Sequence, residues 1–491
     1  MNKLQQIINY KWFPYIFAIL LISIGVIQHF RIFGLDFIGI HTWRQTQTQT
    51  VILNFAYQDF SIFSPHINDI SFNNGLYRME FPLMQWLIAF FYKIFGNHII
   101  ITRLCMFAIS LFSVFGIYKL TALITPNKII RFSMPWLFFF SPIIYYYSVN
   151  PIPDNMALCF SIWSIYFWMK HLQTNTSSSF VWSAVFLALS IALKLPFIVF
   201  GAMYLSKLKT SDAVKKYDFK YLIIPFLICL PSLIWYVSVI PYWNGNGVIA
   251  GVFDNRITFL EYLDFTQFTL LSTLPELLIN YATFPFFILG LVAVFKQLNL
   301  KNKVHLSFIL TLALAIIYFF YEINMIAKVH DYYLFPFLPL AFMVVLKGLD
   351  YAFKMEKKYF RMLFILTFLV CPLTAYLRCN QRWNLYHPGT TKEFLFYKQT
   401  LQNKLPKEAK VIVDNDESNC INLYYLNRKG WGYTKGKLTA KLIEERISQG
   451  ATHLCTDNGL EKNDDLNCYF DSLVIDIKPI KIYTLKLPKQ K

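Results

Sequence analysis

Ionisable and aromatic side chains gather in short polar segments at the ends of long apolar runs. The first such segment contains His41, Trp43, Arg44 and Gln45, and Glu80 follows it directly before Phe-Pro. A carboxylate at the mouth of an apolar segment costs free energy unless it is paired or used. An imidazole, whose ordinary pKa is about 6.5, or a carboxylate can take a proton from a hydroxyl group. We therefore predict His41 and Glu80 as catalytic residues.

Three later polar sites have both a structural and a chemical interpretation. Asp154 lies between two apolar runs, where it can cap a helix or act in catalysis. Lys194 lies where an apolar run should leave the membrane, so it can extend to the headgroups or meet an anion. His330 and Tyr332 open another run, as part of an aromatic belt or as phosphate contacts. We add Asp154 to the predicted catalytic residues.

Positive charge is what a leaving phosphate needs most, and Arg suits bidentate phosphate recognition. The predicted substrate-binding residues are Trp43, Arg44, Gln45, Arg78, Lys194, Arg256, Lys328, His330 and Tyr332. Trp and Arg also anchor proteins at headgroup depth, and Arg78 could be a structural partner of Glu80. His41, Glu80 and Asp154 could together ligate a divalent metal ion, although no ligand spacing requires one.

The composition defines the class of protein that must position these residues. The 491 residues are 56% hydrophobic, 19% aromatic and only 15% charged, whereas soluble domains carry about 25% charged residues. Disorder and an ordinary soluble enzyme are thereby excluded, and a mean hydropathy of +0.42 indicates a polytopic membrane protein. The net charge of +18 fits Lys- and Arg-rich cytoplasmic loops better than nucleic-acid binding.

Apolar segments of about 20 residues predict a bundle of about eleven membrane spans. They cover residues 13–33, 98–120, 132–149, 155–170, 179–194, 196–206, 221–240, 283–296, 304–321, 333–347 and 360–378. The first reads as an uncleaved anchor, because no small-residue cleavage site follows it. Alternating the spans from a cytoplasmic N-terminus places most Lys and Arg residues of the short connecting loops inside. The sequence thus predicts a multi-pass plasma (inner) membrane protein.

The predicted fold is mainly α, a transmembrane bundle with a small α/β domain at its C-terminal end. The bundle covers residues 1–380, with a first outer loop and juxtamembrane helix at 34–97 and a second large outer loop at 241–283. Residues 381–491 are predicted to form a soluble extracytoplasmic (periplasmic) domain. Its expected strands lie at 411–414, 451–455 and 473–477, and its expected helix at 438–450. No pairing is predicted for Cys420, Cys455 and Cys468.

The order and sidedness of these motifs resemble the GT-C superfamily of membrane glycosyltransferases. The resemblance is to the branch of protein O-mannosyltransferases, ArnT-type aminoarabinose transferases and RgtA/B/C/D-like enzymes. It covers residues 13–380 and rests on the segments 41–45, 80–82, 95–103, 141–154 and 330–336. It implies transfer of a sugar from a polyprenyl-phosphate donor to an envelope lipid, glycan or protein acceptor at the outer face, with inversion. The family usually has an Asp where this chain has His41-Thr42, so Asp36 is a reserve base.

Two other classes of function share part of this pattern. A ligase or polymerase of lipid-linked oligosaccharides would need the same phosphate contacts. A transporter or flippase of envelope lipids predicts ionisable residues near the middle of the membrane and broken helices, whereas here they cluster at the outer mouths. No glycine-rich nucleotide motif is present, which disfavours a nucleotide-sugar donor.

Overall fold

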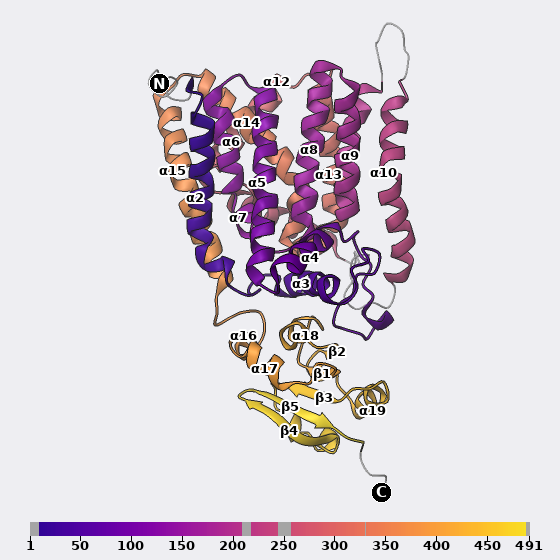
Figure 1. The fold of residues 1–491 in the computed structure, drawn as a ribbon. Coiled ribbons are helices and arrows are strands. Elements are labelled where there is room, and N and C mark those ends of the chain that lie inside the picture. The colour runs from indigo at the N-terminus through magenta and orange to yellow at the C-terminus, as the bar shows by residue number, and fades with distance from the viewer. Residues whose placement is uncertain (1–8, 209–217, 244–256, 329, 488–491) are drawn as a thin grey trace. The chain divides into compact units, whose positions relative to one another are not determined.

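The structure is a computed structural model that describes residues 9–208, 218–243, 257–328 and 330–487 (Figure 1). The chain forms two compact units. Of the described residues, the helical unit takes 9–34, 103–208, 218–243, 257–328 and 330–380, and the sheet unit takes 35–102 and 381–487. The structure thus groups the first loop with the C-terminal segment, whereas the sequence analysis assigned residues 34–97 to the transmembrane module.

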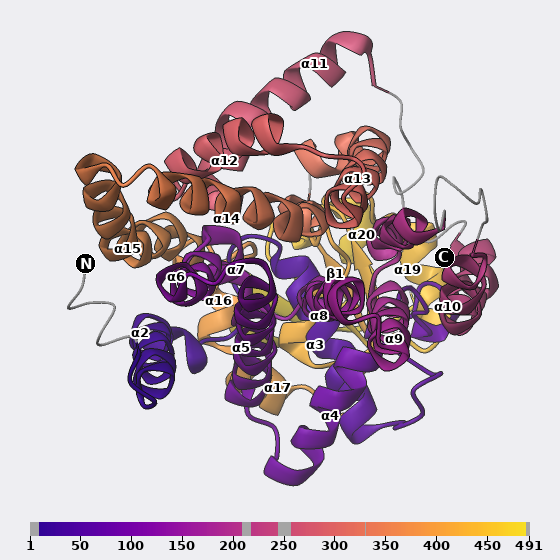
Figure 2. The same cartoon turned by 90° about the horizontal axis from the view of Figure 1, so that it is seen from above.

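The helical unit is a bundle whose long helices run roughly parallel or antiparallel to one another, whereas the segments 259–279 and 284–297 are bent by 113° (Figure 1). Its helices are α2 (Phe13–Phe33), α5 (Ile99–Ile124), α6 (Lys128–Phe139), α7 (Pro142–Tyr147), α8 (Pro153–Thr174), α9 (Ser177–Leu193), η2 (Leu195–Lys207), α10 (Lys220–Val239), η3 (Ile240–Trp243), α11 (Phe259–Phe268), η4 (Thr269–Ile279), α12 (Phe284–Gln297), α13 (Lys303–Lys328), η5 (Asp331–Phe337), α14 (Leu338–Lys354) and α15 (Lys358–Asn380). In the view along the helix axes, α8 lies beside α9 and α12 lies beside α14 (Figure 2).

Two glycines allow α12 and α14 to pack closely. A Cβ atom at Gly290 would lie 1.9 Å from the carbonyl oxygen of Val344, and one at Gly348 would lie 1.8 Å from that of Phe286. Small residues at a contact between apolar helices let the two backbones approach, as in membrane helix pairs. Any larger side chain at either position would force α12 and α14 apart.

The predicted count of eleven spans is not confirmed. Among the described residues, six helices are long and apolar enough to cross a membrane, or up to seven if the bent pair 259–279 and 284–297 counts as one. The other expected spans are helical but too short or too polar for that count. The expected span 132–149 is divided into α6 and α7, because Pro142 disfavours helical backbone at the preceding residue. Residues 259–279, which the sequence placed in a loop, form α11 and η4.

The sheet unit combines a five-stranded sheet with short helices. Its helices are α3 (Thr42–Tyr57), η1 (Asn73–Gly75), α4 (Leu83–Phe95), η6 (Gln381–Trp383), α16 (Lys392–Phe396), α17 (Lys398–Lys404), α18 (Ile421–Leu426), α19 (Ala440–Ser448), η7 (Leu460–Lys462) and α20 (Asp464–Asn467). Its strands are β1 (Val411–Asp414), β2 (Gly430–Tyr433), β3 (His453–Thr456), β4 (Phe470–Ile477) and β5 (Ile480–Leu485), in the order β2-β1-β3-β5-β4. β1 pairs in parallel with β2 and β3, whereas β5 pairs antiparallel with β3 and β4.

Successive side chains of a strand point to opposite faces, and this explains why helices cover both faces of this sheet. Val411 and Val413 pack into one buried cluster with α16, α17 and α18, and Ile412 between them packs into another with α19. The expected strands at 411–414, 451–455 and 473–477 and the helix at 438–450 therefore correspond to β1, β3, β4 and α19, with ends shifted by a few residues.

An ion pair connects the two sequence segments of the sheet unit. Lys398 Nζ lies 2.6 Å from Asp36 Oδ2, and the hydroxyl of Tyr424 donates to Asp36 Oδ1 at 2.6 Å. Burial acts to raise the pKa of Asp36, but the Lys398 charge and the hydrogen bonds outweigh it and hold the pKa below its ordinary value of 3.8. Asp36, the reserve base of the sequence analysis, is therefore occupied in a structural contact.

Lys398→Met should destabilise the sheet unit by about 2 kcal/mol at pH 7, because Asp36 loses its counter-ion in a largely buried position. A carboxylate with a lowered folded pKa contributes stability above its unfolded pKa and loses that contribution as the pH falls through the folded pKa. The difference in Tm between wild type and variant should therefore shrink below about pH 4. Thermal unfolding of the full chain in detergent measures it. The control is Lys404→Met at an exposed position. An equal decrease in Tm for the two variants would contradict the account.

Candidate functional site

Two helix ends in the helical unit bring opposite charges together. Lys194 follows the last residue of α9 in extended backbone (φ −158°), directly before η2, which has Pro at its start. Asp154 lies in the first turn of α8. Cations are favoured at helix C-termini and anions at N-termini. Lys194 Nζ lies 3.5 Å from Asp154 Oδ1, and the two side chains are only 12% and 2% exposed. Asp154 is not the N-cap of α8, since Ile152 holds that position.

Aromatic side chains form a wall beside this ion pair. Lys194 Nζ lies 4.9 Å from the ring centre of Tyr333 and 5.8 Å from that of Tyr332, within range of cation–π attraction. The Tyr332 hydroxyl and His330 Nδ1 form a hydrogen bond of 3.1 Å. The structure thus brings together Asp154, Lys194, His330 and Tyr332, four residues singled out in the sequence. We call them the Lys194 centre.

Two further carboxylates lie at the Lys194 centre, and the sequence analysis missed both. The hydroxyl of Tyr147 donates to Asp331 Oδ1 at 2.6 Å. Glu322 on α13 is buried, is acted on by the charge of Lys194, and its Oε2 has no hydrogen-bond partner among the described residues. An ionisable residue within an apolar helix was the signal that could have identified Glu322.

The sheet unit contains a second buried ion pair. Arg44 Nη2 on α3 lies 2.7 Å from Glu80 Oε1, and the two side chains are 3% and 6% exposed. The side-chain amide of Gln85 donates to the same Glu80 oxygen at 3.1 Å, and Arg44 also donates to Gln47. The pairing of Glu80 with Arg44 differs from the expectation that Arg78 would be its structural partner. Arg78 is exposed, and its Nε donates to the carbonyl of Phe63.

A small cleft opens beside this second pair. Arg44, Tyr77 and Glu80 are among its lining residues, and it holds about 240 Å³ of space, part of it open to solvent. Thr48 Oγ1 and Gln85 Oε1 are buried there without hydrogen-bond partners among the described residues. Buried polar atoms are normally satisfied, so this cleft suits a polar guest such as a hydroxyl group. We call the ion pair and the cleft the Glu80 centre.

The other predicted residues of the sheet unit have structural contacts. His41 is the half-buried N-cap of α3 in left-handed backbone (φ 58°), a conformation that is uncommon outside glycine. Trp43 packs against the hydrophobic cluster of the sheet. The amide of Gln45 donates to the carbonyl of Ile40 at 2.8 Å. Direct roles of these three residues in binding or catalysis stay predictions.

Arg256, Lys328 and the predicted metal ion are the remaining predictions from the sequence. Arg256 is outside the described residues, and Lys328 ends α13 with a side chain that is also outside them. Within the described ranges, no group of three or more His, Cys, Asp or Glu side chains could hold a metal ion. The divalent ion on His41, Glu80 and Asp154 therefore stays a prediction.

Comparisons with known proteins agree with this architecture. The sequence model of the family described as dolichyl-phosphate-mannose-protein mannosyltransferase matches residues 80–235. No curated protein sequence matches the chain. ArnT from Cupriavidus metallidurans bound to undecaprenyl phosphate matches the fold with a TM-score of 0.66 at 11% identity, over 95% of this chain and 97% of that one.

Two further solved structures share the fold. The archaeal oligosaccharyltransferase AglB from Archaeoglobus fulgidus, in complex with an inhibitory peptide and a dolichol-phosphate, matches with a TM-score of 0.56 at 12% identity, over 92% of this chain and 70% of that one. Arabinofuranosyltransferase AftD from Mycobacteria matches at 0.50 and 11% identity, over 98% of this chain and 40% of that one. The family match and the shared fold confirm the resemblance to the GT-C superfamily of membrane glycosyltransferases.

Arg44→Met should destabilise the full chain by about 3–5 kcal/mol, because it leaves the Glu80 carboxylate buried without its counter-ion. The double variant Arg44→Met/Glu80→Leu removes both charges and should recover most of that loss. The measurement is the Tm in detergent, and the matched control is exposed Arg78→Met, for which we expect a change near zero. A double variant no more stable than Arg44→Met would contradict the ion-pair account.

Proposed function

We propose that this chain is an integral-membrane glycosyltransferase that takes a sugar from a polyprenyl-phosphate donor. The acceptor is an envelope lipid, glycan or protein at the outer face of the membrane. The observation that carries the proposal is the fold shared over 95% of the chain with ArnT bound to undecaprenyl phosphate. The Lys194 centre supports it, because a buried cation beside tyrosine rings can hold a lipid phosphate.

In the proposed reaction the bond between the sugar C1 and the phosphate oxygen breaks, and a bond from the acceptor oxygen to C1 forms on the opposite face. Lys194 contacts the leaving phosphate and stabilises its growing charge, while Asp154 holds the ammonium group in position. Tyr332, oriented by His330, adds a hydrogen bond to a phosphate oxygen. Glu322 accepts a hydrogen bond from a sugar hydroxyl through its available oxygen.

The acceptor hydroxyl must lose its proton to a base. We assign this role to Glu80, whose carboxylate borders a cleft with unsatisfied polar atoms, and keep His41 as the alternative base. Arg44 and Gln85 fix the Glu80 carboxylate by hydrogen bonds, which is how a base is held at a defined distance from its substrate. Arg256 and Lys328 remain proposed phosphate contacts on charge alone.

Contact of the catalytic module with lipid is supported by helix α4. Its buried side includes Met84, Gln85, Ile88 and Tyr92, whereas Leu87, Phe90, Phe91, Ile94 and Phe95 are exposed at spacings that form one apolar face. A helix of 13 residues is too short to span a bilayer. We propose that α4 lies in the membrane interface, where a lipid-linked donor arrives.

Lys194→Met should lower the rate of sugar transfer by about a hundredfold or more, because it removes the positive charge at the leaving phosphate. The matched control is Lys207→Met at the opposite end of η2, which should transfer at the wild-type rate. The assay follows sugar transfer from a polyprenyl-phosphate donor by purified protein. Envelope glycans of a deletion strain, compared by mass spectrometry with those of the complemented strain, identify the acceptor. Wild-type activity in Lys194→Met would contradict the assignment.

A second candidate is transfer of a lipid-linked oligosaccharide. It is favoured by the fold shared with the oligosaccharyltransferase AglB. The mass lost from envelope glycans in the deletion strain separates the two candidates. Loss of one sugar residue supports the single-sugar transferase, whereas loss of a whole oligosaccharide supports the second candidate.

A further inference from the structure

A pocket in the helical unit lies near the start of α13, away from the part of that helix that carries Glu322. It is formed by the end of α5, the end of α12, the start of α13 and the middle of α14, and holds about 560 Å³ of space, part of it open to solvent. Its walls are mainly apolar and include Ile124, Val294, Leu298, Phe308 and Met343.

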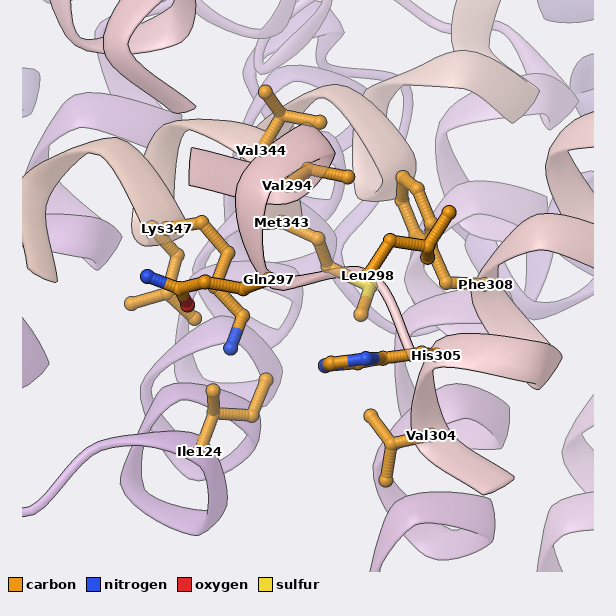
Figure 3. Close-up of a pocket in the computed structure, with 11 residues that line it drawn as sticks. Ile124, Val294, Gln297, Leu298, Val304, His305, Phe308, Met343, Val344 and Lys347 are labelled. Carbon is orange, nitrogen blue, oxygen red and sulfur yellow. The ribbon is translucent and has the colours of Figure 1, made fainter. Parts of the chain in front are cut away.

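Two nitrogen donors point into this apolar pocket. Figure 3 shows the ammonium group of Lys347 and the ring of His305 directed toward the same space from opposite sides. No carboxylate pairs with Lys347 within the part of the chain that the structure describes. The nearby acid Asp350 is paired instead with Lys354, at 2.6 Å. A cation beside apolar walls is costly unless an anion or water meets it.

The hydrogen bond of His305 fixes which nitrogen is available. The backbone N–H of Asn299 donates to His305 Nδ1 at 3.1 Å, so Nδ1 acts as an acceptor. In the neutral imidazole the proton must then lie on Nε2, which is a donor. Lys347 and His305 therefore offer two N–H donors to one guest, and both suit the oxygens of a phosphate.

This pocket is distinct from the Lys194 centre. His305 and Glu322 both lie on α13, separated by 17 residues, which corresponds to about 25 Å along a helix. The connection from α12 to α13, next to the pocket, also carries Lys296, Lys301 and Lys303. Such juxtamembrane basic segments attract anionic lipids by about 1 kcal/mol per charge.

We propose that this pocket binds one anionic glycerophospholipid, with its phosphate between Lys347 and His305 and part of an acyl chain along the apolar walls. A free phosphate would leave the apolar walls exposed, and the ammonium group of a zwitterionic lipid would be repelled by the surrounding lysines. The bound lipid would fill the space between α12, α13 and α14 and stabilise their ends. The proposal does not depend on the sugar transfer proposed above.

Native mass spectrometry of the detergent-purified full chain tests it, with phosphatidylglycerol, phosphatidylcholine or inorganic phosphate added. Wild type should retain one phosphatidylglycerol more tightly than phosphatidylcholine and gain Tm with it. The variant Lys347→Gln/His305→Gln should bind it about tenfold more weakly, because charged hydrogen bonds are lost. Lys404→Gln, at an exposed position of the sheet unit outside the pocket lining, is the matched control and should bind like wild type.

A second variant tests the apolar part of the pocket without changing the donors. Val294→Phe fills the space for the acyl chain and should also lower the bound phosphatidylglycerol, while Lys347→Arg should retain it. Unchanged lipid binding in both the double variant and Val294→Phe would overturn the proposal. Equal binding of phosphatidylcholine, or a Tm gain from inorganic phosphate equal to that from phosphatidylglycerol, would overturn it as well.

Discussion

Charge buried away from water must be paired, and this constraint determines both candidate centres. In the helical unit the ammonium group of Lys194 is balanced by Asp154 and faces the rings of Tyr332 and Tyr333. In the sheet unit Arg44 balances Glu80. The desolvation cost of such ions is several kcal/mol each, so these pairs are weak as a source of stability and make better sense as prepared sites. A phosphate oxygen that approaches Lys194 would share its ammonium group with Asp154, which keeps that group in position.

The helix ends supply the geometry that this constraint needs. α9 stops at Leu193 and α8 starts at Pro153, so the positive and negative side chains sit where the helix dipoles favour them. The short η5 then adds His330 and Tyr332 at the start of α14. Because each side chain is placed by a rigid element, the centre is preorganised before any substrate arrives.

Much of this arrangement could be predicted, since ionisable residues in an apolar sequence are few and costly. The four residues of the Lys194 centre each interrupt an apolar run, so the sequence identified them individually. Their proximity in space could not be predicted, because about 180 residues separate Asp154 from Tyr332. Glu322 was missed because it directly follows the expected span 304–321 and no role was assigned to it. The strands of the tail were predicted from short apolar runs such as Val411–Asp414. Residues 35–102 pack with the tail through contacts such as the ion pair of Asp36 with Lys398. A local sequence pattern does not predict contacts between residues so far apart in the chain.

A structure of the full chain in a lipid nanodisc with undecaprenyl phosphate would test the central claim most directly. The account predicts phosphate density within about 4 Å of Lys194 Nζ, the range of a charge-assisted contact, and within hydrogen-bond distance of the Tyr332 hydroxyl. Phosphate density elsewhere, with none near Lys194 Nζ, would contradict it.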